Sequence, residues 1–459
     1  MDFLHSEERD LRGVIKRFRN RDFKGTGGQV IKNSTYQLAT NLSAKVGSVL
    51  FTIVIARMLL PELFGLYSLS LSTIVLFSTF SDLGIGSAMV TFISKALSNK
   101  DNKKAKSYYF YLSKYKIVLI IFSSILLILC SYFIANFYYE KPIFIALLFG
   151  GVYLLVNGMI SLISSPFTAI NNFKIPFVKE LIFQILRISV VPLGIYLIFR
   201  GNISQEFSIA IVIFLLTLCY FFSLIYLYFS RKKIYFLKAN KKSLNVSEKK
   251  SLKKFVLPLS LTVLSGLFFG YIDTLMLGHY VESTYIGYYG AAFGLIGAAS
   301  TLIGFVSGSV LPVFSRLKNK SLESLFKKIL IFTISVSLFA AVFTFFLAKY
   351  ILYIYGAEYL PAVGLLKLFS ILLIIIPLSA TFDTYLISRR KTSKMAWFII
   401  ISTIVNIVLN YSFITYGLRF GMMQAVTGAC IATIISKVLY FSLVGIYRRK
   451  ISKKYKAPN

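Results

Sequence analysis

The chain has 459 residues, of which 57% are hydrophobic and only 15% are charged, and its formal net charge is +34. Soluble domains have about 45–50% apolar and about 25% charged residues, so this chain is too apolar for a soluble enzyme. The 43 Phe and 30 Tyr residues exclude a disordered protein, and the long apolar runs argue against nucleic acid as a partner despite the basic charge.

Residues 1–33 precede the first apolar run and hold eight basic and five acidic side chains. They lack the apolar core of a cleavable signal peptide. Leu11, Val14, Ile15 and Phe18 fall at helical spacing. This pattern predicts a short basic amphipathic helix on the cytoplasmic surface of a membrane.

Twelve apolar segments follow, and each is long enough to cross a bilayer, which takes about 20 residues. The predicted spans are 34–58, 63–93, 110–135, 143–170, 181–199, 207–229, 255–278, 285–313, 329–354, 362–387, 396–416 and 422–447. The sequence therefore predicts an all-α polytopic membrane protein with both termini on one side.

The loops on the side of the N-terminus hold 42 of the 51 Lys and Arg residues. The opposite loops hold only Lys141, Arg200 and Arg419. Because cytoplasmic loops are enriched in Lys and Arg, this split predicts a cell-membrane protein with both termini in the cytoplasm. The basic loops are expected to contact anionic membrane lipid.

The longest basic connection, residues 230–254, divides the spans into six and six. The expected organisation is a basic cytoplasmic N-terminus (1–33), an N-lobe (34–229), this basic linker (230–254), a C-lobe (255–447) and a basic cytoplasmic tail (448–459).

The two lobes resemble each other in sequence near the start of their second spans. The N-lobe has ARMLLPELFGLYSLS and the C-lobe has GHYVESTYIGYYGAAF, so that Gly65 and Tyr67 match Gly287 and Tyr289. Six spans return the chain to its starting side, so the repeats are parallel. Such repeats place a substrate path between the lobes.

Lys45 lies near the middle of the first span, out of easy reach of either surface. It belongs to a polar stripe at helical spacing made by Ser34, Gln37, Asn41, Lys45, Ser48 and Thr52. A polar stripe within a membrane must face protein or water. We therefore expect Lys45, Asn41 and Ser48 to line a hydrated substrate cavity in which Lys45 contacts an anion. The alternative is a buried structural ion pair.

Two more ionisable side chains are cavity candidates, because such groups are costly within spans. Arg187 lies close to the inner end of its span, where it either lines the cavity or extends to the cytoplasm. Asp273 lies in the outer third of the seventh span. It either pairs with a cation across the lobes or binds a coupling ion, Na⁺ or H⁺. The secondary candidates are Asp82, Asp383 and Lys437.

Motifs for catalysis and for metal binding are missing from the sequence. The three Cys residues form no CxxC pair, and only two His residues occur, so neither a disulfide framework nor a metal site is expected. No GxSxG motif occurs, and Lys32 follows Ile31 rather than the Gly of a P-loop. The chain is therefore not expected to be an enzyme or to need a cofactor.

Three GxxxG pairs occur in the C-lobe, at Gly266–Gly270, Gly290–Gly294 and Gly304–Gly308. They predict close helix packing, and the alternative is close approach of a ligand.

Several segments together resemble a known family. These are IARMLLPELFGLYSLSLS at 55–72, SDLGIGSAMVTFISKA at 81–96, YIDTLMLGHYVESTYIGYYGAA at 271–292, VNIVLN at 405–410 and GMMQAVTGACIAT at 421–433. With the span count, they resemble the polysaccharide transporter, or O-antigen flippase, branch of the multidrug/oligosaccharidyl-lipid/polysaccharide exporter superfamily.

The resemblance implies two six-helix lobes in a MATE-like exporter fold that works by alternating access. It implies transfer of a polyprenyl-diphosphate-linked oligosaccharide to the outer leaflet, with Lys45 and Arg187 making the cavity cationic. The chain is then expected to act as a monomer, alongside polysaccharide-assembly partners. The alternatives are a cation-coupled multidrug exporter of the same superfamily and a membrane-embedded polysaccharide polymerase or ligase.

Overall fold

The computed structural model describes residues 25–198, 203–240, 242–317 and 319–456. Within these ranges the regular elements are all helices. The amphipathic helix expected around residues 11–18 lies outside the described residues.

The N-lobe is formed by six α-helices and one π-helix. They are α2 (Gly25–Asp82), α3 (Ile85–Ser98), α4 (Asn102–Phe133), η1 (Ile134–Tyr138), α5 (Phe144–Ala169), α6 (Lys174–Ile198) and α7 (Gln205–Ser230).

The C-lobe follows two short 3₁₀ helices, η2 (Arg231–Lys233) and η3 (Tyr235–Lys238). Its helices are α8 (Val246–Tyr280), α9 (Ser283–Ser309), α10 (Leu311–Arg316), α11 (Asn319–Tyr353), η4 (Ala357–Ala362), α12 (Val363–Phe369), α13 (Leu372–Ser388), α14 (Thr392–Leu418) and α15 (Met422–Lys456).

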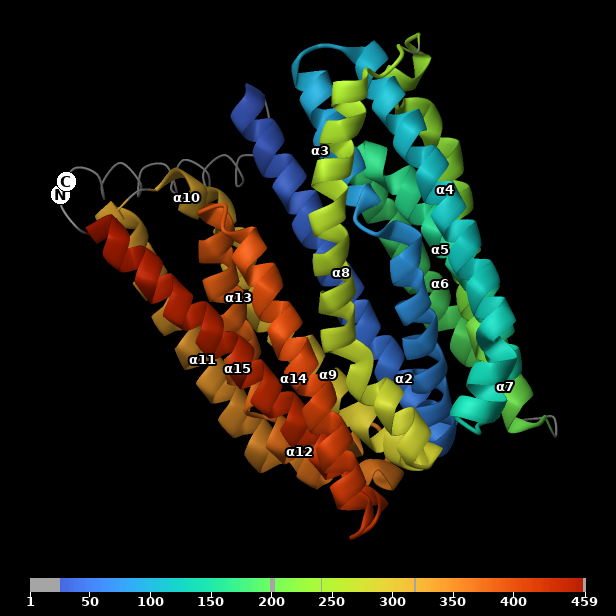
Figure 1. Ribbon diagram of the computed structural model, residues 1–459. Helices are drawn as coiled ribbons and strands as arrows, with labels where there is room; N and C mark the ends of the chain where they lie inside the picture. The colour runs from blue at the N-terminus through green and yellow to red at the C-terminus, as the bar shows by residue number, and fades with distance from the viewer. Residues whose placement is uncertain (1–24, 199–202, 241, 318, 457–459) are drawn as a thin grey trace.

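The described residues contain nine helices long and apolar enough to cross a membrane, or eleven when two bent pairs each count as one span. One of these, Thr35–Ser98, includes a break at Leu60, whose φ of 59° and ψ of 169° lie outside the helical region. The two arms of α2 on either side of this break run in opposite directions (Figure 1). Counting the two arms as separate spans gives twelve within the described residues, the number predicted from the sequence.

The helix ends differ from the predicted spans where polar residues extend or interrupt a helix. α8 begins at Val246 rather than at 255, because Asn245 and Glu248 form a capping box in front of a Lys-rich first turn. The second predicted span is interrupted between α2 and α3, where Leu83 and Gly84 have positive φ angles. Apolar windows mark where the bilayer lies, not where a helix begins or ends.

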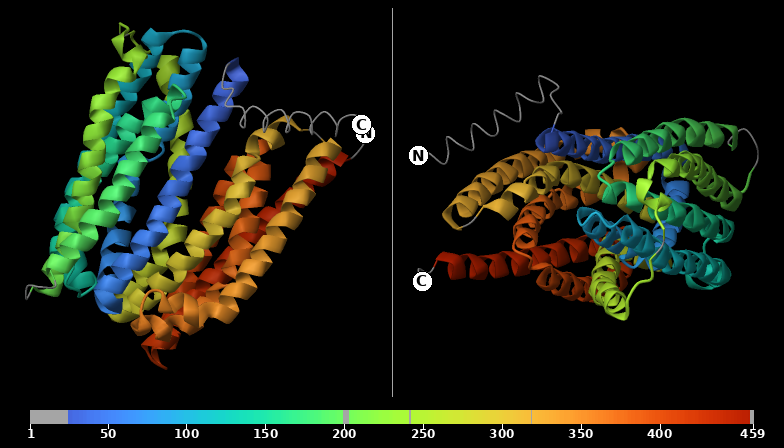
Figure 2. Two further views of the ribbon diagram at one scale, coloured as in Figure 1. Left: turned by 180° about the vertical axis from the view of Figure 1, so that it is seen from behind. Right: turned by 90° about the horizontal axis from the view of Figure 1, so that it is seen from above.

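The two lobes converge at one end of the bundle and diverge toward the other (Figure 1, Figure 2). We call the first the closed end; it holds the break at Leu60. We call the second the open end; α2 begins there and α15 ends there.

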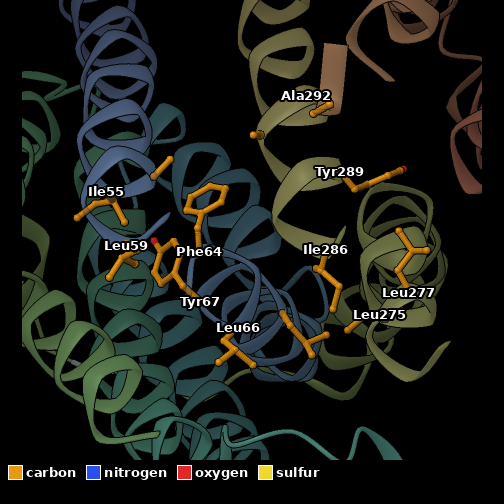
Figure 3. Close-up of a cluster of buried hydrophobic side chains, with 14 of the residues drawn as sticks. Ile55, Leu59, Phe64, Leu66, Tyr67, Leu275, Leu277, Ile286, Tyr289 and Ala292 are labelled. Atoms are coloured by element: carbon orange, nitrogen blue, oxygen red, sulfur yellow. The ribbon is translucent and has the colours of Figure 1, made fainter. Parts of the chain in front are cut away.

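The hydrophobic cores follow this division. The largest cluster of buried side chains draws on both lobes and includes Leu59 and Phe64 of α2 and Ile286 of α9. Figure 3 shows its side chains on α2 beside those of α8 and α9. Two further clusters are separate, one within residues 85–252 and one within 269–451. The lobes therefore share a core at the closed end, while the second cluster joins N-lobe residues to Leu252 of α8 and the third lies in the C-lobe.

Candidate functional site

The closed end is sealed where the second arm of α2 crosses α9. A Cβ added at Gly65 would overlap the main chain of Ser283, and a Cβ added at Gly287 would overlap the main chain of Pro61. Each glycine therefore packs against the residue four positions before the other. Only glycine permits an approach this close between two helix backbones.

Three hydrogen bonds to main-chain carbonyls join the lobes beside this crossing, within the described residues. They run from Tyr359 Oη to Ala56 O (2.8 Å), from Lys141 Nζ to Gly278 O (2.6 Å) and from His279 Nδ1 to Tyr138 O (2.5 Å). Burial lowers the pKa of the Lys141 ammonium, and the nearby Glu140 and Glu282 oppose that shift.

A cavity of about 180 Å³ opens where α2 and α9 diverge from the closed end. Lys45, Ser48 and Thr52 line it from the N-lobe. Gly294 and Gly297 line it from the C-lobe, and a Cβ added at either glycine would meet no atom within 4 Å. The cavity thus has polar side chains on its α2 wall, and its α9 wall consists of these two glycines with Leu295 and Ala298.

The polar stripe of the first arm of α2 continues from this cavity toward the open end. Gln37, Asn41, Lys45 and Ser48 are all exposed. Within the described part of the chain, Lys45 forms no ion pair or hydrogen bond. An exposed ammonium without a protein partner can attract an anion.

Arg187 of α6 lies deeper, inside the N-lobe. Its guanidinium carbon is 4.7 Å from the ring centroid of Phe51 and 5.0 Å from that of Phe183. Its Nε and Nη2 atoms are buried and have no hydrogen-bond partner within the described residues. Arg187 is therefore a half-buried cation that contacts aromatic faces and pairs with no carboxylate within the described residues.

Asp273 does not line the open cavity, because only 2% of the residue is exposed. Its Oδ1 accepts a hydrogen bond from Asn410 Nδ2 at 2.6 Å. The Oδ1 atoms of Asn406 and Asn410 are buried nearby on α14 without a hydrogen-bond partner among the described residues. The polar partner of Asp273 thus lies in its own lobe rather than across the lobes.

Lys437 of α15 also lies in the interior of the C-lobe. Its Nζ donates to Phe269 O at 3.0 Å and sits 3.4 Å from the centroid of the Phe269 ring. Asp383 lies elsewhere in this lobe and accepts a hydrogen bond from Tyr440 Oη at 2.8 Å. Lys437 thus contacts Phe269, Asp383 bonds Tyr440, and neither side chain lines the cavity of Lys45.

Asp82 lies in the N-lobe at the end of α2 and forms an ion pair with Lys116 of α4. Lys116 Nζ is 2.5 Å from Asp82 Oδ1, and the Lys116 side chain is completely buried. The count of 42 loop cations includes Lys116, taken to lie at the mouth of the third span; α4 extends from Asn102 and carries this lysine into the N-lobe, where its side chain is buried. Its neighbours from Ile117 onward are apolar, which is the signal that could have identified it.

Most of the GxxxG glycines also differ from expectation. Added Cβ atoms at Gly266, Gly270, Gly294 and Gly308 would meet nothing within 4 Å, so close helix packing is wrong for these positions. The close approach of helices occurs instead at Gly65 and Gly287, in the matched segments of the two lobes.

Two family models match the sequence. One, described as polysaccharide biosynthesis protein, covers residues 30–318, which is more than half of the chain. The other, described as MatE, covers residues 258–412. No curated protein matches the sequence.

Three solved structures illustrate the fold. The lipid II flippase MurJ in an inward closed conformation is 18% identical with a TM-score of 0.64, over 88% of this chain and 86% of that one. An inward-facing multidrug resistance MATE family transporter of the MOP superfamily is 15% identical with a TM-score of 0.58, over 93% and 96% of the two chains.

The third structure is a MOP superfamily transporter from Pyrococcus furiosus, described as having a binding pocket of reverse polarity. It is 12% identical with a TM-score of 0.53, over 94% of this chain and 97% of that one. At these identities the likenesses establish the fold. They confirm a multi-pass membrane protein with the MATE-like architecture that the sequence motifs indicate, and the solved relatives are transporters and flippases rather than enzymes.

Proposed function

Since the chain belongs to the polysaccharide biosynthesis protein family, we propose that it is a flippase that moves a polyprenyl-diphosphate-linked oligosaccharide across the cell membrane. The observation that carries this proposal is the exposed Lys45 in the cavity between the lobes, which has no partner within the described residues. It supplies a cation at the place where a transported head group would cross.

The physical task of such a flippase fits this cavity. A diphosphate and its sugars lose their hydration in hydrocarbon, which costs many kcal/mol. Polar groups of the α2 stripe would replace that water, and Lys45 would neutralise part of the charge. Arg187 adds a second cation within the same lobe. The isoprenoid tail can stay in the lipid throughout.

The basic loops support an orientation with the open end toward the cytoplasm. In that orientation the described state would accept substrate from the inner leaflet. Outward movement of each negative charge gains about 2.3 kcal/mol per 100 mV of inside-negative potential. Transport then requires the Gly65–Gly287 crossing to separate while the open end closes.

We also propose Asp273 as the site of a coupling cation, Na⁺ or H⁺. Asn410 donates a hydrogen bond to its carboxylate, and the Oδ1 atoms of Asn410 and of Asn406, one turn away on α14, have no hydrogen-bond partner within the described residues. Oxygen atoms of this kind are ligands for hard cations. A proton on Asp273 would serve the same purpose without further ligands. We further propose that the protein acts as a monomer, that its basic loops contact anionic lipid and that it works with polysaccharide-assembly partners.

A second candidate function is export of cationic drugs, since the MatE model matches part of the C-lobe. A cationic drug needs an acidic cavity, whereas the exposed charge at the lobe boundary is Lys45. The sign of this charge favours an anionic substrate.

The phenotype of a strain that lacks the gene distinguishes the two functions. The flippase proposal predicts loss of surface glycan, accumulation of the lipid-linked precursor inside the cell and unchanged drug susceptibility. Complementation by the wild-type chain should restore the glycan. Normal surface glycan together with raised drug susceptibility would overturn the proposal in favour of the drug exporter.

A further inference from the structure

A second, larger cavity lies within the N-lobe, apart from the one lined by Lys45. Its volume is about 460 Å³, within the range of about 300–1,000 Å³ that small-molecule sites occupy. It is bounded by the end of α2, by α3 and by α5. Six hydroxyl side chains line it: Ser87, Thr91, Ser161, Ser164, Ser165 and Thr168.

The charges of this cavity cancel. Asp82 is its one ionisable lining residue, and Asp82 Oδ1 receives both Lys116 Nζ at 2.5 Å and the main-chain N–H of Gly86 at 3.0 Å. Gly86 makes room for this arrangement, because a Cβ there would lie 3.1 Å from Asp82 Oδ1 and 3.3 Å from Lys116 Nζ. The cavity therefore offers no net charge to hold a phosphate or a cation.

Several polar atoms of the lining residues have unused hydrogen-bonding capacity. One third of the Asp82 side chain is exposed, and its Oδ2 accepts no hydrogen bond within the described residues. Ser164 Oγ is buried without a partner there. Ser161 Oγ accepts a hydrogen bond from Lys116 Nζ at 2.8 Å, so its own O–H can still donate.

A neutral cavity that mixes hydroxyl donors and acceptors with one carboxylate acceptor matches the hydroxyl groups of a sugar. We propose that this cavity is a subsite that binds uncharged sugar residues of the transported glycan. The inference rests on the proposed flippase function and adds a division of labour to it. Lys45 would hold the diphosphate, and the Asp82–Ser164 cavity would select the sugar.

The test measures binding of two kinds of lipid to the purified protein in detergent by native mass spectrometry. The probes are polyprenyl diphosphate alone and polyprenyl diphosphate linked to one hexose or N-acetylhexosamine, from a small panel of sugars. The wild type should bind at least one sugar-bearing lipid more tightly than the bare lipid. The double variant Ser164→Ala, Thr168→Val should lose about tenfold of that preference and keep its affinity for the bare lipid.

The matched control is Ser123→Ala. Ser123 Oγ is likewise buried without a partner within the described residues, but Ser123 lies on α4 and does not line this cavity. The control should retain the sugar preference. Retained preference in the double variant, or equal binding of every probe by the wild type, would overturn the subsite while leaving the flippase proposal intact. A wild type that binds neither kind of lipid would overturn both.

Discussion

Gly65 and Gly287 pack reciprocally: each lies against the main chain four residues before the other, at Ser283 and Pro61. These glycines come from the matched segments of the two lobes, so the crossing relates the lobes by an approximate two-fold axis. It belongs to the closed end, which an alternating-access cycle has to open.

Gly65→Ala or Gly287→Ala should therefore destabilise the described conformation relative to the one open at this end. An added methyl group in such a contact costs about 1–3 kcal/mol, which is about a 5- to 150-fold shift in a two-state equilibrium. Spin labels at positions 62 and 282, measured by pulsed electron resonance in a Cys-free background, should show a larger population at long distance.

Gly445→Ala is the control for that experiment, because a Cβ at Gly445 would meet nothing within 4 Å. Its distance distribution should match that of the parent. If the Gly65 and Gly287 variants also match the parent, the crossing does not hold the closed end together.

Arg187→Met should abolish most transport without loss of stability. The guanidinium Nε and Nη2 are buried and have no partner within the described residues, so an apolar side chain of similar length removes a desolvation cost while it keeps contacts with Phe51 and Phe183. We expect transport to fall about tenfold or more, the loss of one charged interaction. Thermal unfolding in detergent should occur at an unchanged or higher temperature. A large drop in that temperature with normal transport would instead indicate a structural role.

Asp273→Asn should make transport insensitive to the coupling ion. The variant keeps a polar side chain beside Asn410 but removes the charge and the titratable group. The measurement is glycolipid flipping in vesicles with and without an imposed Na⁺ or pH gradient. Asp383→Asn is the matched control, since Asp383 is a carboxylate within the same lobe that bonds Tyr440 instead. A gradient response that survives in Asp273→Asn would place the coupling site elsewhere.

Lys116→Met should lower the free energy of unfolding by about 3 kcal/mol, because it leaves the Asp82 carboxylate without its buried partner. The double variant Lys116→Met, Asp82→Met should recover most of this loss, since both charges are then gone. Thermal unfolding of the two variants in one detergent provides the comparison. A double variant no more stable than the single one would show that the pair contributes more than mutual neutralisation.

The sequence was sufficient to predict the twelve spans and the exposed polar stripe around Lys45. Both are properties of a single helix: its apolar length and the spacing of its polar side chains. The family motifs add the arrangement of the lobes.

Contacts between helices could not be predicted in this way. The Lys116–Asp82 pair joins residues 34 positions apart, and the burial of Asp273 depends on α14, which is far along the chain. The prediction of close helix packing from the GxxxG pairs was wrong at most positions, because this spacing occurs on open helix faces as well as on packed ones. Gly294 faces the cavity lined by Lys45, whereas Gly287 packs against the main chain of Pro61.

In the proposed transport cycle, the ammonium of Lys45, which has no partner within the described residues, contacts the lipid diphosphate. Flipping of a polyprenyl-diphosphate-linked oligosaccharide in reconstituted vesicles tests this contact most directly, with Lys45→Ala compared with Lys349→Ala, an exposed lysine on α11 outside the cavity. We predict about a tenfold or greater loss of rate for Lys45→Ala and none for Lys349→Ala, with partial recovery in Lys45→Arg. Wild-type flipping by a correctly folded Lys45→Ala protein would contradict the account.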